Sequence, residues 1–338
     1  MSHFVSKIAD QQFVCTNQMA CKIKKEDRIL IVGSSGLIGS ACLKVLHKKG
    51  YSNLLLPTHE TLDFCDYNAV LRYFENNEVD VVIQAAGKVG GILENQRNPA
   101  TFLTTNLLIN LNTAIAAERH QCNRVVFLGS SCMYPKECDQ PMHVDDLFTG
   151  KLEPTSQAYA TSKIASLELG FAFNKQSNTD RYLCLIPNSV FGPHDNFDPE
   201  SGHVLSSLIS RFHRAREIQE DTVILWGTGE PLREFIYSED VADAIVFMLE
   251  NGIAAPEAPI NVGSGFEISI SALANLIKSE VGFAGDIIWD NTKPNGSLRK
   301  ILDNSMLHNL GWSAKTNIKS GIKSSYEWYL ANGSRIAA

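Results

Sequence analysis

The 338-residue sequence lacks several features that would assign it to other classes of protein. It has no apolar run of about 18 residues, so no transmembrane helix is predicted, and its first 26 residues hold no apolar stretch of signal-peptide length. It also lacks any block of like charges, and its net charge of -7 argues against a nucleic acid or an anionic membrane as partner. We therefore expect a cytoplasmic protein that binds a small molecule.

Paired cysteines are missing as well. The eight cysteines are scattered, no CxxC pair occurs, and several cysteines lie within apolar runs. This usage is typical of a reducing compartment, and no metal site is predicted. Internal repeats and low-complexity segments are also absent from the sequence. The length of the chain favours one large domain or two unequal parts that share a core.

What the sequence does contain, from residue 28 onward, is an alternation of short apolar runs and helical stretches. The β-rich runs, which suit strands buried on both faces, are 28–33, 53–57, 79–87, 123–129 and 181–187. The helical stretches between them are 36–49, 66–77, 99–119 and 157–177. This alternation predicts an α/β fold with a doubly wound parallel Rossmann sheet.

After residue 187 the alternation gives way to loops rich in proline and glycine. The later elements expected are strands at 222–226 and 259–263 and helices at 239–250, 269–281 and 316–332. The domains predicted are an N-terminal extension at 1–26, a dinucleotide-binding domain at 27–188 and a smaller α/β substrate domain at 189–338. Parts of 222–263 are expected to return to the first sheet, and the extension is either disordered or an extra surface helix.

A glycine-rich turn, GSSGLIG, joins the first predicted strand to the first predicted helix. Gly33, Gly36 and Gly39 let the backbone approach a pyrophosphate, whose charge meets the N-terminus of the helix. Tight turns and close helix packing also use glycine, but the position between strand and helix predicts a dinucleotide site.

The second predicted strand ends without the acidic residue with which NAD enzymes usually bind the adenosine ribose. The 2'-phosphate of NADP would therefore not be repelled there, and Ser35, Thr58 and His59 can hydrogen-bond it. No arginine is present at this tip, and Glu60 follows closely. We predict NADP(H) as the cofactor, with a loop that tolerates either cofactor as the alternative.

Tyr159 and Lys163 form a Y-x-x-x-K pair on one face of the fourth predicted helix. A lysine ammonium so placed is expected to lower the pKa of the tyrosine and make it a proton donor to a carbonyl oxygen. Ser130 ends the preceding strand, where it can hydrogen-bond the same oxygen. The three residues together predict a hydride-transfer site rather than a surface pair.

Longer motifs follow one another in a fixed order along the chain. They are AAGKVGGILENQRNPATFLTTN (85–106), FLGSSCMYP (127–135), QPMHVDDLFTGKLEPTSQAYATSKIA (140–165), PNSVFGPHDNF (187–197), WGTGEPLREF (226–235) and TKPNGSLRKILD (292–303). With them the chain resembles the extended short-chain dehydrogenase/reductases, and among these the GDP-L-fucose synthase family, from about Arg28 to Trp328. The resemblance implies an NADPH-dependent 3,5-epimerase/4-reductase that acts on GDP-4-keto-6-deoxy-mannose.

The resemblance also implies the roles of two further residues. Cys132 and His203 would be the acid/base pair for epimerisation at C3 and C5, and Ser130, Tyr159 and Lys163 would assist reduction at C4. The chemistry is consistent, because a ketone at C4 acidifies both neighbouring C–H bonds, and cysteine and histidine titrate near neutrality. Without the resemblance, an inert buried cysteine and an ordinary loop histidine would be the simpler interpretation.

The ligand-binding candidates come from the same motifs. For the cofactor they are Gly33, Ser35, Gly36, Leu37, Ile38, Gly39, Thr58, His59, Asp63, Ala85, Ala86, Asn106, Tyr159, Lys163, Pro187, Asn188 and Val190. For the GDP-sugar they are Ser131, Lys88, Asn188, His203, Arg211, Trp226, Arg233 and Arg299, with Lys300 as a possible alternative to Arg299. Guanidinium groups suit a diphosphate because they grip its oxygens in pairs.

The chain departs from the family pattern at several places. Pro187-Asn188-Ser189 stands for a PTN motif, LEPTSQAYA for LEPTNE-x-YA, and arginines of the glycine loop and second strand are missing. The missing arginines weaken the prediction of NADP. The changes near the sugar pocket favour a related GDP-4-keto sugar, either the 3,6-dideoxy-mannose that leads to colitose or a heptose. The alternatives are a C4 reductase without epimerase activity and a non-catalytic dinucleotide-sensing protein. Helices 99–119 and 157–177 would form a homodimer.

Overall fold

The computed structural model describes residues 21–253, 258–293 and 295–336, so most of the predicted N-terminal extension lies outside the described residues. A six-stranded sheet has the strand order β2-β1-β3-β4-β5-β9, and every neighbouring pair is parallel. Its strands are β1 (Ile29–Val32), β2 (Leu54–Leu55), β3 (Val81–Gln84), β4 (Arg124–Leu128), β5 (Tyr182–Pro187) and β9 (Ile260–Val262). The predicted doubly wound parallel sheet is confirmed.

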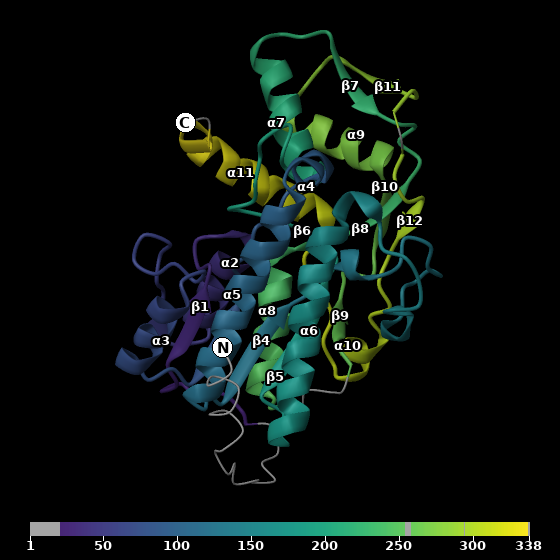
Figure 1. Ribbon diagram of the computed structural model, residues 1–338. Coiled ribbons are helices and arrows are strands. Elements are labelled where there is room, and N and C mark those ends of the chain that lie inside the picture. The colour runs from purple at the N-terminus through teal and green to yellow at the C-terminus, as the bar shows by residue number, and fades with distance from the viewer. Residues whose placement is uncertain (1–20, 254–257, 294, 337–338) are drawn as a thin grey trace.

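Helices cover both faces of this sheet (Figure 1). In β1, Ile29 and Ile31 belong to one core with helices α2 (Leu37–Lys48) and α8 (Ser238–Glu250). Leu30 and Val32 belong to a second core on the opposite face. The helices on that face are α3 (Tyr67–Asn76), α5 (Pro99–Arg119) and α6 (Gln157–Ser177). Burial on both faces explains why the strands were visible as continuous apolar runs.

The order of the sheet reverses at β1, which has β2 on one side and β3 on the other. In an open parallel sheet, ligands bind outside the carboxyl ends of the strands at such a reversal. The glycine-rich turn follows β1 directly. The topology therefore places this turn where a dinucleotide would bind.

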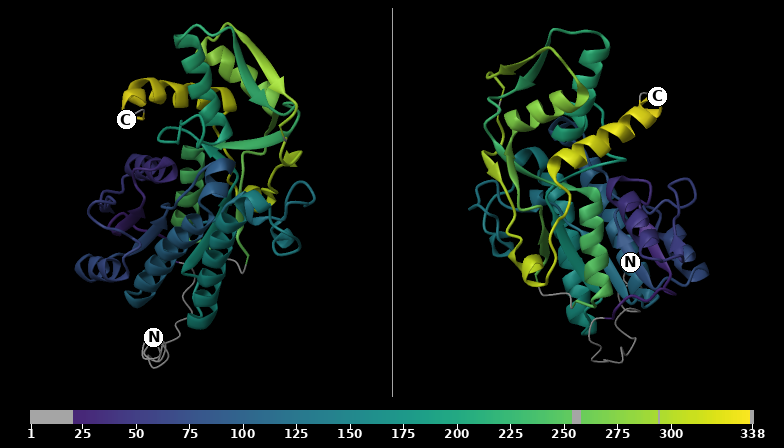
Figure 2. Two further views of the ribbon diagram at one scale, coloured as in Figure 1. Left: turned by 45° about the horizontal axis from the view of Figure 1, so that its top comes forward. Right: turned by 180° about the vertical axis from the view of Figure 1, so that it is seen from behind.

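A second part of the molecule lies beyond the carboxyl ends of the sheet (Figure 2). Here β8 (Leu232–Tyr237) pairs with β10 (Glu267–Ser269), β12 (Arg299–Lys300) and β6 (Ser189–Phe191), and β7 (Thr222–Trp226) pairs with β11 (Asp286–Asp290). A third core joins these strands to α7 (Val204–Glu217), α9 (Ile270–Val281) and α11 (Ile318–Ile336). The short helices are α4 (Ile92–Arg97), α10 (Ser305–Asn309), η1 (Ser131–Met133), η2 (Val144–Asp146) and η3 (Pro154–Ser156).

Several elements after residue 187 were not predicted from the sequence. Helix α7 buries Leu205, Leu208, Ile209 and Phe212, a spacing typical of an amphipathic helix, although the segment follows a loop rich in polar residues. Strand β8 was hidden because Glu234 interrupts its apolar pattern, yet Glu234 is fully buried. Within the described residues, no helix combines the length and the apolar character needed to cross a membrane.

Candidate active site

The glycine-rich turn brings the backbone close to the neighbouring strand. Gly33 has a φ of +80°, and a Cβ there would come within 2.8 Å of the backbone of Ala86. A Cβ on Gly39 would lie 2.0 Å from the carbonyl oxygen of Gly33. Helix α2 begins after Gly36, whose position provides no side-chain cap for the first N–H groups. These free donors, with Leu37 in the first turn, fit a pyrophosphate.

The tip of the second strand carries the polar residues proposed for the adenosine end of the cofactor. Thr58, His59 and Glu60 are exposed there, and the Thr58 hydroxyl donates to Glu60 at 3.3 Å. Asp63 accepts a hydrogen bond from the backbone N–H of Cys65. Thr58 and His59 are therefore exposed at this tip, and their contact with the 2'-phosphate stays a prediction.

Asn106 connects the loop after β3 to helix α5. Its side chain accepts from the backbone N–H of Lys88 at 2.9 Å and donates to the Lys88 carbonyl at 3.0 Å. A Cβ on Gly87 would lie 2.7 Å from Asn106 Oδ1 and 3.7 Å from Lys163 Nζ. The loop that contains Ala85 and Ala86 therefore passes directly beside Lys163.

Ser130, Tyr159 and Lys163 come together at the carboxyl end of β4. Ser130 caps η1, and its hydroxyl forms a hydrogen bond with Tyr159 on α6. Lys163 Nζ lies 5.8 Å from the centre of the Tyr159 ring, and Phe102 packs edge-on against the same ring. Tyr159 and Lys163 are both buried. The helical spacing thus places both side chains on the sheet-facing side of α6.

The electrostatics of this group differ from the sequence-based expectation. Burial, followed by the charge of Cys132, raises the pKa of Tyr159 above its ordinary value, although the Ser130 hydrogen bond lowers it. Burial also lowers the pKa of Lys163 to about 8. The expectation of a lowered tyrosine pKa was wrong, because burial and the charge of Cys132 outweigh the effect of Ser130. Tyr159 therefore keeps its proton at neutral pH and can act as a donor.

Cys132 lies on η1 beside a cation. Lys300, on β12, donates from Nζ to the Cys132 Sγ atom at 3.8 Å. Burial would raise the pKa of the Cys132 thiol, but the Lys300 ammonium opposes this effect. The hydroxyls of Ser130 and Ser156, and then the charge of His203, add to the opposing effect and bring the pKa below its ordinary value. A thiolate is the nucleophilic and basic form of cysteine, so the site favours proton abstraction.

The Lys300 contact gives a direct prediction. In Lys300→Met the pKa of Cys132 is expected to rise, so alkylation of Cys132 by iodoacetamide at pH 7 should slow by about tenfold. Lys300→Arg keeps the positive charge and serves as the matched control. The rate is measured on the Cys132 peptide by mass spectrometry across a pH series. Equal midpoints for the Met and Arg variants would contradict the assignment.

His203 is the N-cap residue of α7 and is the second candidate proton carrier. Its Nδ1 atom is buried and lies 3.9 Å from Oδ1 of Asp195. Burial opposes protonation of the imidazole, yet the Asp195 carboxylate and the charge of Cys132 raise the pKa of His203 above its ordinary value. Both shifts favour the same pair of charged forms, the thiolate that removes a proton and the imidazolium that returns one.

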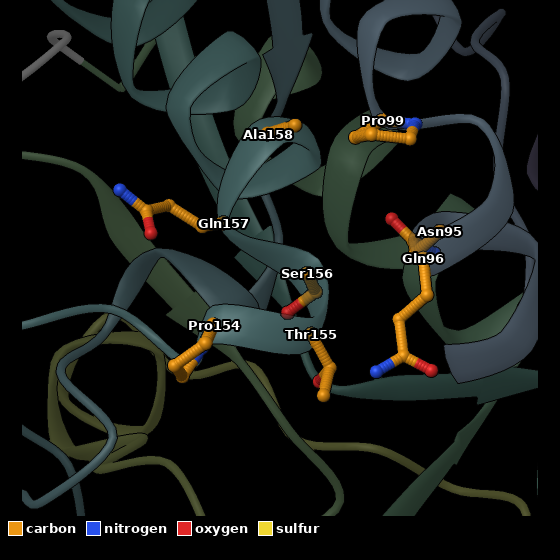
Figure 3. Close-up of a pocket in the computed structure, with 8 residues that line it drawn as sticks. All are labelled: Asn95, Gln96, Pro99, Pro154, Thr155, Ser156, Gln157 and Ala158. Atoms are coloured by element: carbon orange, nitrogen blue, oxygen red, sulfur yellow. The ribbon is translucent and has the colours of Figure 1, made fainter.

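A cavity of about 320 Å³ is lined by residues of α4, the start of α5, η3 and the start of α6 (Figure 3). In Figure 3 the residues of η3 and the start of α6 face those of α4 and the start of α5 across it. Its lining residues are Asn95, Gln96, Pro99, Pro154, Thr155, Ser156, Gln157 and Ala158. Ser156, which lines this cavity, is also one of the hydroxyls that lower the pKa of Cys132. Ser156 and Gln157 belong to the segment that departs from the family pattern.

Arg211 and Arg233 are cations without carboxylate partners among the described residues. Arg211 donates to the Ile224 carbonyl and Arg233 to the Leu232 carbonyl, and burial lowers the pKa of both guanidinium groups. Partly buried arginines whose partners are only carbonyls are suited to bind a diphosphate.

The other substrate candidates lie in different surroundings. Trp226 ends β7, is 52% exposed and has Lys293 over its ring. Arg299 is engaged in a bidentate pair with Glu267, whereas Lys300 faces Cys132. Ser131 is buried on η1, and the Lys88 ammonium pairs with Glu94. Arg299 and Lys300 therefore point to different partners, although they are adjacent in sequence.

Glu234 was not singled out from the sequence, yet it anchors one wall of the site. Its Oε2 accepts from Asn188 Nδ2 at 2.6 Å and from the backbone N–H of Leu302 at 3.0 Å. Its Oε1 accepts from the backbone N–H of Gly265 at 2.7 Å and from Asn304 Nδ2 at 3.2 Å. One fully buried carboxylate thus ties Asn188, beside Pro187 and near Val190, to the segment that carries the cation next to Cys132.

Removal of Glu234 should destabilise the protein strongly. In Glu234→Ala four donors lose their acceptor inside the molecule, and the expected loss in free energy of unfolding is about 3–5 kcal/mol. The control is Glu230→Ala, because Glu230 is exposed and nearby on the chain; its effect should stay within about 0.5 kcal/mol. Urea unfolding measures both values. A loss below about 1 kcal/mol in Glu234→Ala would contradict this account.

Three residues of the site were therefore missed: Asp195, Ser156 and Glu234. Asp195 and Ser156 lie within the quoted motifs, but nothing in the sequence links them to His203 or Cys132. A charged residue inside the apolar run of β8 was the available signal for Glu234. The pairing of Lys300 with Cys132 spans 168 residues, so only the fold could bring these two together.

Comparison with known proteins places this geometry in a wider context. A family model described as the NAD dependent epimerase/dehydratase family matches residues 29–263. Among characterised sequences, GDP-L-fucose synthase 1 of Arabidopsis thaliana is 42% identical over 308 residues, which cover 91% of this chain and 94% of the relative.

Two solved structures are similar over the whole fold. A GDP-6-OMe-4-keto-L-xylo-heptose reductase from C. jejuni has a TM-score of 0.87 at 29% identity, with 92% of this chain and 99% of that chain covered. A GDP-L-fucose synthetase from Naegleria fowleri bound to NADP has a TM-score of 0.84 at 26% identity, with 94% and 98% covered.

Proposed function

The chain belongs to the NAD dependent epimerase/dehydratase family, and from this premise we propose that it is an NADPH-dependent bifunctional enzyme. It inverts C3 and C5 of a GDP-4-keto-6-deoxy-mannose type sugar and reduces C4, giving GDP-L-fucose or a close relative. The observation that carries the proposal is the contact of Lys300 with Cys132. This contact lowers the pKa of the thiol, and Ser130 and the proton donor Tyr159 lie in the same site.

The glycine turn and the residues after β3 would hold the cofactor. Gly33 and Gly39 keep the backbone close enough for a pyrophosphate at the N-terminus of α2, and the exposed Thr58 and His59 suit the 2'-phosphate of NADP. NADPH supplies the hydride for C4 when bound. The NADP bound to the structurally similar fucose synthetase supports this cofactor. Lys163 lies next to Gly87 on the wall between the loop after β3 and α6.

Epimerisation depends on two proton carriers and an oxyanion site. The Cys132 thiolate removes the proton next to the C4 ketone, and His203 returns one to the opposite face of the same carbon. Ser130 and Tyr159 hold the oxygen that becomes negative in between, because their neighbouring hydroxyls at the end of β4 can both donate to it. The same sequence of steps inverts C3 and C5, since both carbons are bonded directly to the carbonyl carbon C4.

Reduction then uses the same hydroxyl groups. Tyr159 gives its proton to the oxygen at C4 as the hydride reaches the carbon, and the raised pKa keeps that proton available at neutral pH. Arg211 and Arg233 anchor the diphosphate of GDP, which agrees with their lack of carboxylate partners among the described residues. Arg299 and Trp226 remain proposed contacts of the same nucleotide.

A reductase without epimerase activity is the second candidate. The similarity to the heptose reductase favours it, together with the unusual residues Ser156 and Gln157 that line the cavity. The two candidates differ in solvent deuterium incorporation at C3 and C5, which only the bifunctional enzyme catalyses. The identity of the sugar is tested separately by a comparison of kcat/KM with GDP-4-keto-6-deoxy-mannose, its 3-deoxy analogue and a GDP-4-keto-heptose. The fucose-type assignment predicts the highest value for the first, and a heptose preference would overturn it.

The working form of the enzyme is proposed to be a cytoplasmic homodimer, with the dinucleotide bound mainly by residues 27–188 and the GDP-sugar by residues 189–338. Leu108 and Leu111 of α5 are 43% and 41% exposed, which supports a helical interface. The seven described cysteines are free, which supports a reducing compartment. Sedimentation equilibrium tests the dimer, and a monomer at micromolar concentration would contradict it.

A further inference from the structure

The carboxylate of Asp195 faces the buried side of the His203 ring. His203 Nδ1 is buried and has no hydrogen-bond partner among the described residues, and Asp195 Oδ1 lies 3.9 Å away. The side chain of His203 is nevertheless 44% exposed. Because Nδ1 contributes nothing to this exposure, the exposed part is the remainder of the ring, which carries Nε2. One nitrogen therefore faces a carboxylate, and the other is left for a ligand.

Asp195 is itself held in place from two sides. Its Oδ2 accepts from the Ser206 hydroxyl at 2.6 Å, and its Oδ1 accepts from the backbone N–H of Asn196 at 2.8 Å. Ser206 is buried in the first turn of α7, the helix that begins after His203. The side chain of Asp195 is only 5% exposed. A buried carboxylate so fixed cannot turn away to solvent, and its charge must be matched locally.

We propose that Asp195 is a positioning residue for the epimerase step, which holds His203 with Nδ1–H toward the carboxylate so that Nε2 exchanges the proton with the sugar. This inference rests on the proposed function. A carboxylate on one nitrogen fixes both the tautomer and the direction of a catalytic imidazole. The distance of 3.9 Å is an ion-pair distance, and closure to a hydrogen bond needs a ring shift of only about 1 Å.

Two charged groups around the imidazole, Asp195 and Cys132, raise the pKa of His203. From η1, the charge of Cys132 raises the pKa of His203, as does Asp195 from the loop before α7, whereas burial lowers it. Lys300 from β12 acts on Cys132 rather than on the histidine. The thiolate and the carboxylate thus favour imidazolium from two sides, and removal of Asp195 leaves one of them.

The test is Asp195→Asn, which keeps the size of the side chain and removes its charge. The first readout is a nitrogen-15 NMR titration of His203 in the free protein, assigned with His203→Gln. The titration midpoint is expected to move to lower pH in Asp195→Asn, and the protonated tautomer should no longer be confined to Nδ1. A midpoint and tautomer identical to the wild type would overturn the proposal, whether or not the enzyme turns over.

The second readout is solvent deuterium incorporation at C3 and C5 across a pH series. We expect the rate in Asp195→Asn to fall by about 10- to 100-fold at neutral pH, with its high-pH limit moved to lower pH. Exchange in both enzymes with the same profile would also overturn the proposal. If the NMR titration of His203 shifts in Asp195→Asn but the wild type incorporates no deuterium, the proposed function is overturned. The effect of Asp195 on His203 would then still be established.

Two further variants separate positioning from folding. Asp198→Asn changes the neighbouring carboxylate of the same loop, which is exposed and bonded to Ser201 and Glu200. It is expected to leave both readouts unchanged. Ser206→Ala removes one hydrogen bond from Asp195 and should shift the titration in the same direction by a smaller amount. If Asp195→Asn unfolds, the Ser206→Ala titration decides, and a midpoint equal to that of the wild type would overturn the proposal.

Discussion

Tyr159→Phe is expected to lower the rate of C4 reduction by about 10²- to 10⁴-fold. The variant keeps the buried ring against Phe102 and removes only the hydroxyl that donates to the C4 oxygen. Because burial raises the pKa of Tyr159, the wild-type hydroxyl is protonated at neutral pH and can donate, whereas the phenylalanine has no proton to give. The rate is followed by NADPH absorbance with saturating GDP-keto-sugar.

The matched control for this variant is Tyr182→Phe. The Tyr182 hydroxyl is also buried, but it bonds to the carbonyl of Ala114 and to Glu118 beneath the sheet. Its loss should cost about 1 kcal/mol of stability and leave the rate of reduction unchanged. A Tyr159→Phe enzyme that reduces the sugar as fast as Tyr182→Phe would show that the proton comes from another group.

Cys132→Ser is expected to lower deuterium incorporation at C3 and C5 by about 10²- to 10⁴-fold. A serine hydroxyl fits the same space, but Lys300 cannot bring it to an anionic form near neutral pH as it can the thiol. Reduction, which uses Tyr159 and Ser130, should persist and yield a sugar with its original configuration at C3 and C5. Proton NMR of the product measures both effects.

Cys138→Ser is the control for the thiol. Burial raises the pKa of Cys138 to about 11, followed by the effect of Asp146, so this cysteine stays a thiol at neutral pH. Its replacement should change neither exchange nor reduction. If Cys132→Ser exchanges deuterium as fast as Cys138→Ser, the proton-carrying role of Cys132 is wrong.

The strands and most helices of the first part could be predicted because burial on both faces leaves uninterrupted apolar runs. The second part could not be predicted so well, since its short strands are interrupted by polar residues with buried partners. Glu234 in β8 is one of them: its four hydrogen bonds join segments from Asn188 to Asn304. A pattern read along the chain cannot show that such a carboxylate is satisfied.

The sequence predicted some members of the candidate site but not its electrostatics. The Y-x-x-x-K spacing and the motif order singled out Tyr159, Lys163 and Cys132, and the fold places all three at the carboxyl end of the sheet. The direction of the Tyr159 pKa was missed because burial does not appear in a helical spacing. The Lys300 contact was missed because β12 reaches η1 only through its pairing with β8.

The central claim is that one site both moves protons at C3 and C5 and reduces C4. It is tested most directly by proton NMR of the nucleotide sugar formed from GDP-4-keto-6-deoxy-mannose and NADPH in heavy water. The account predicts a reduced L-sugar with deuterium at C3 and at C5. A reduced sugar with both carbons still protonated would contradict it, and would leave a C4 reductase in which Cys132 carries no proton.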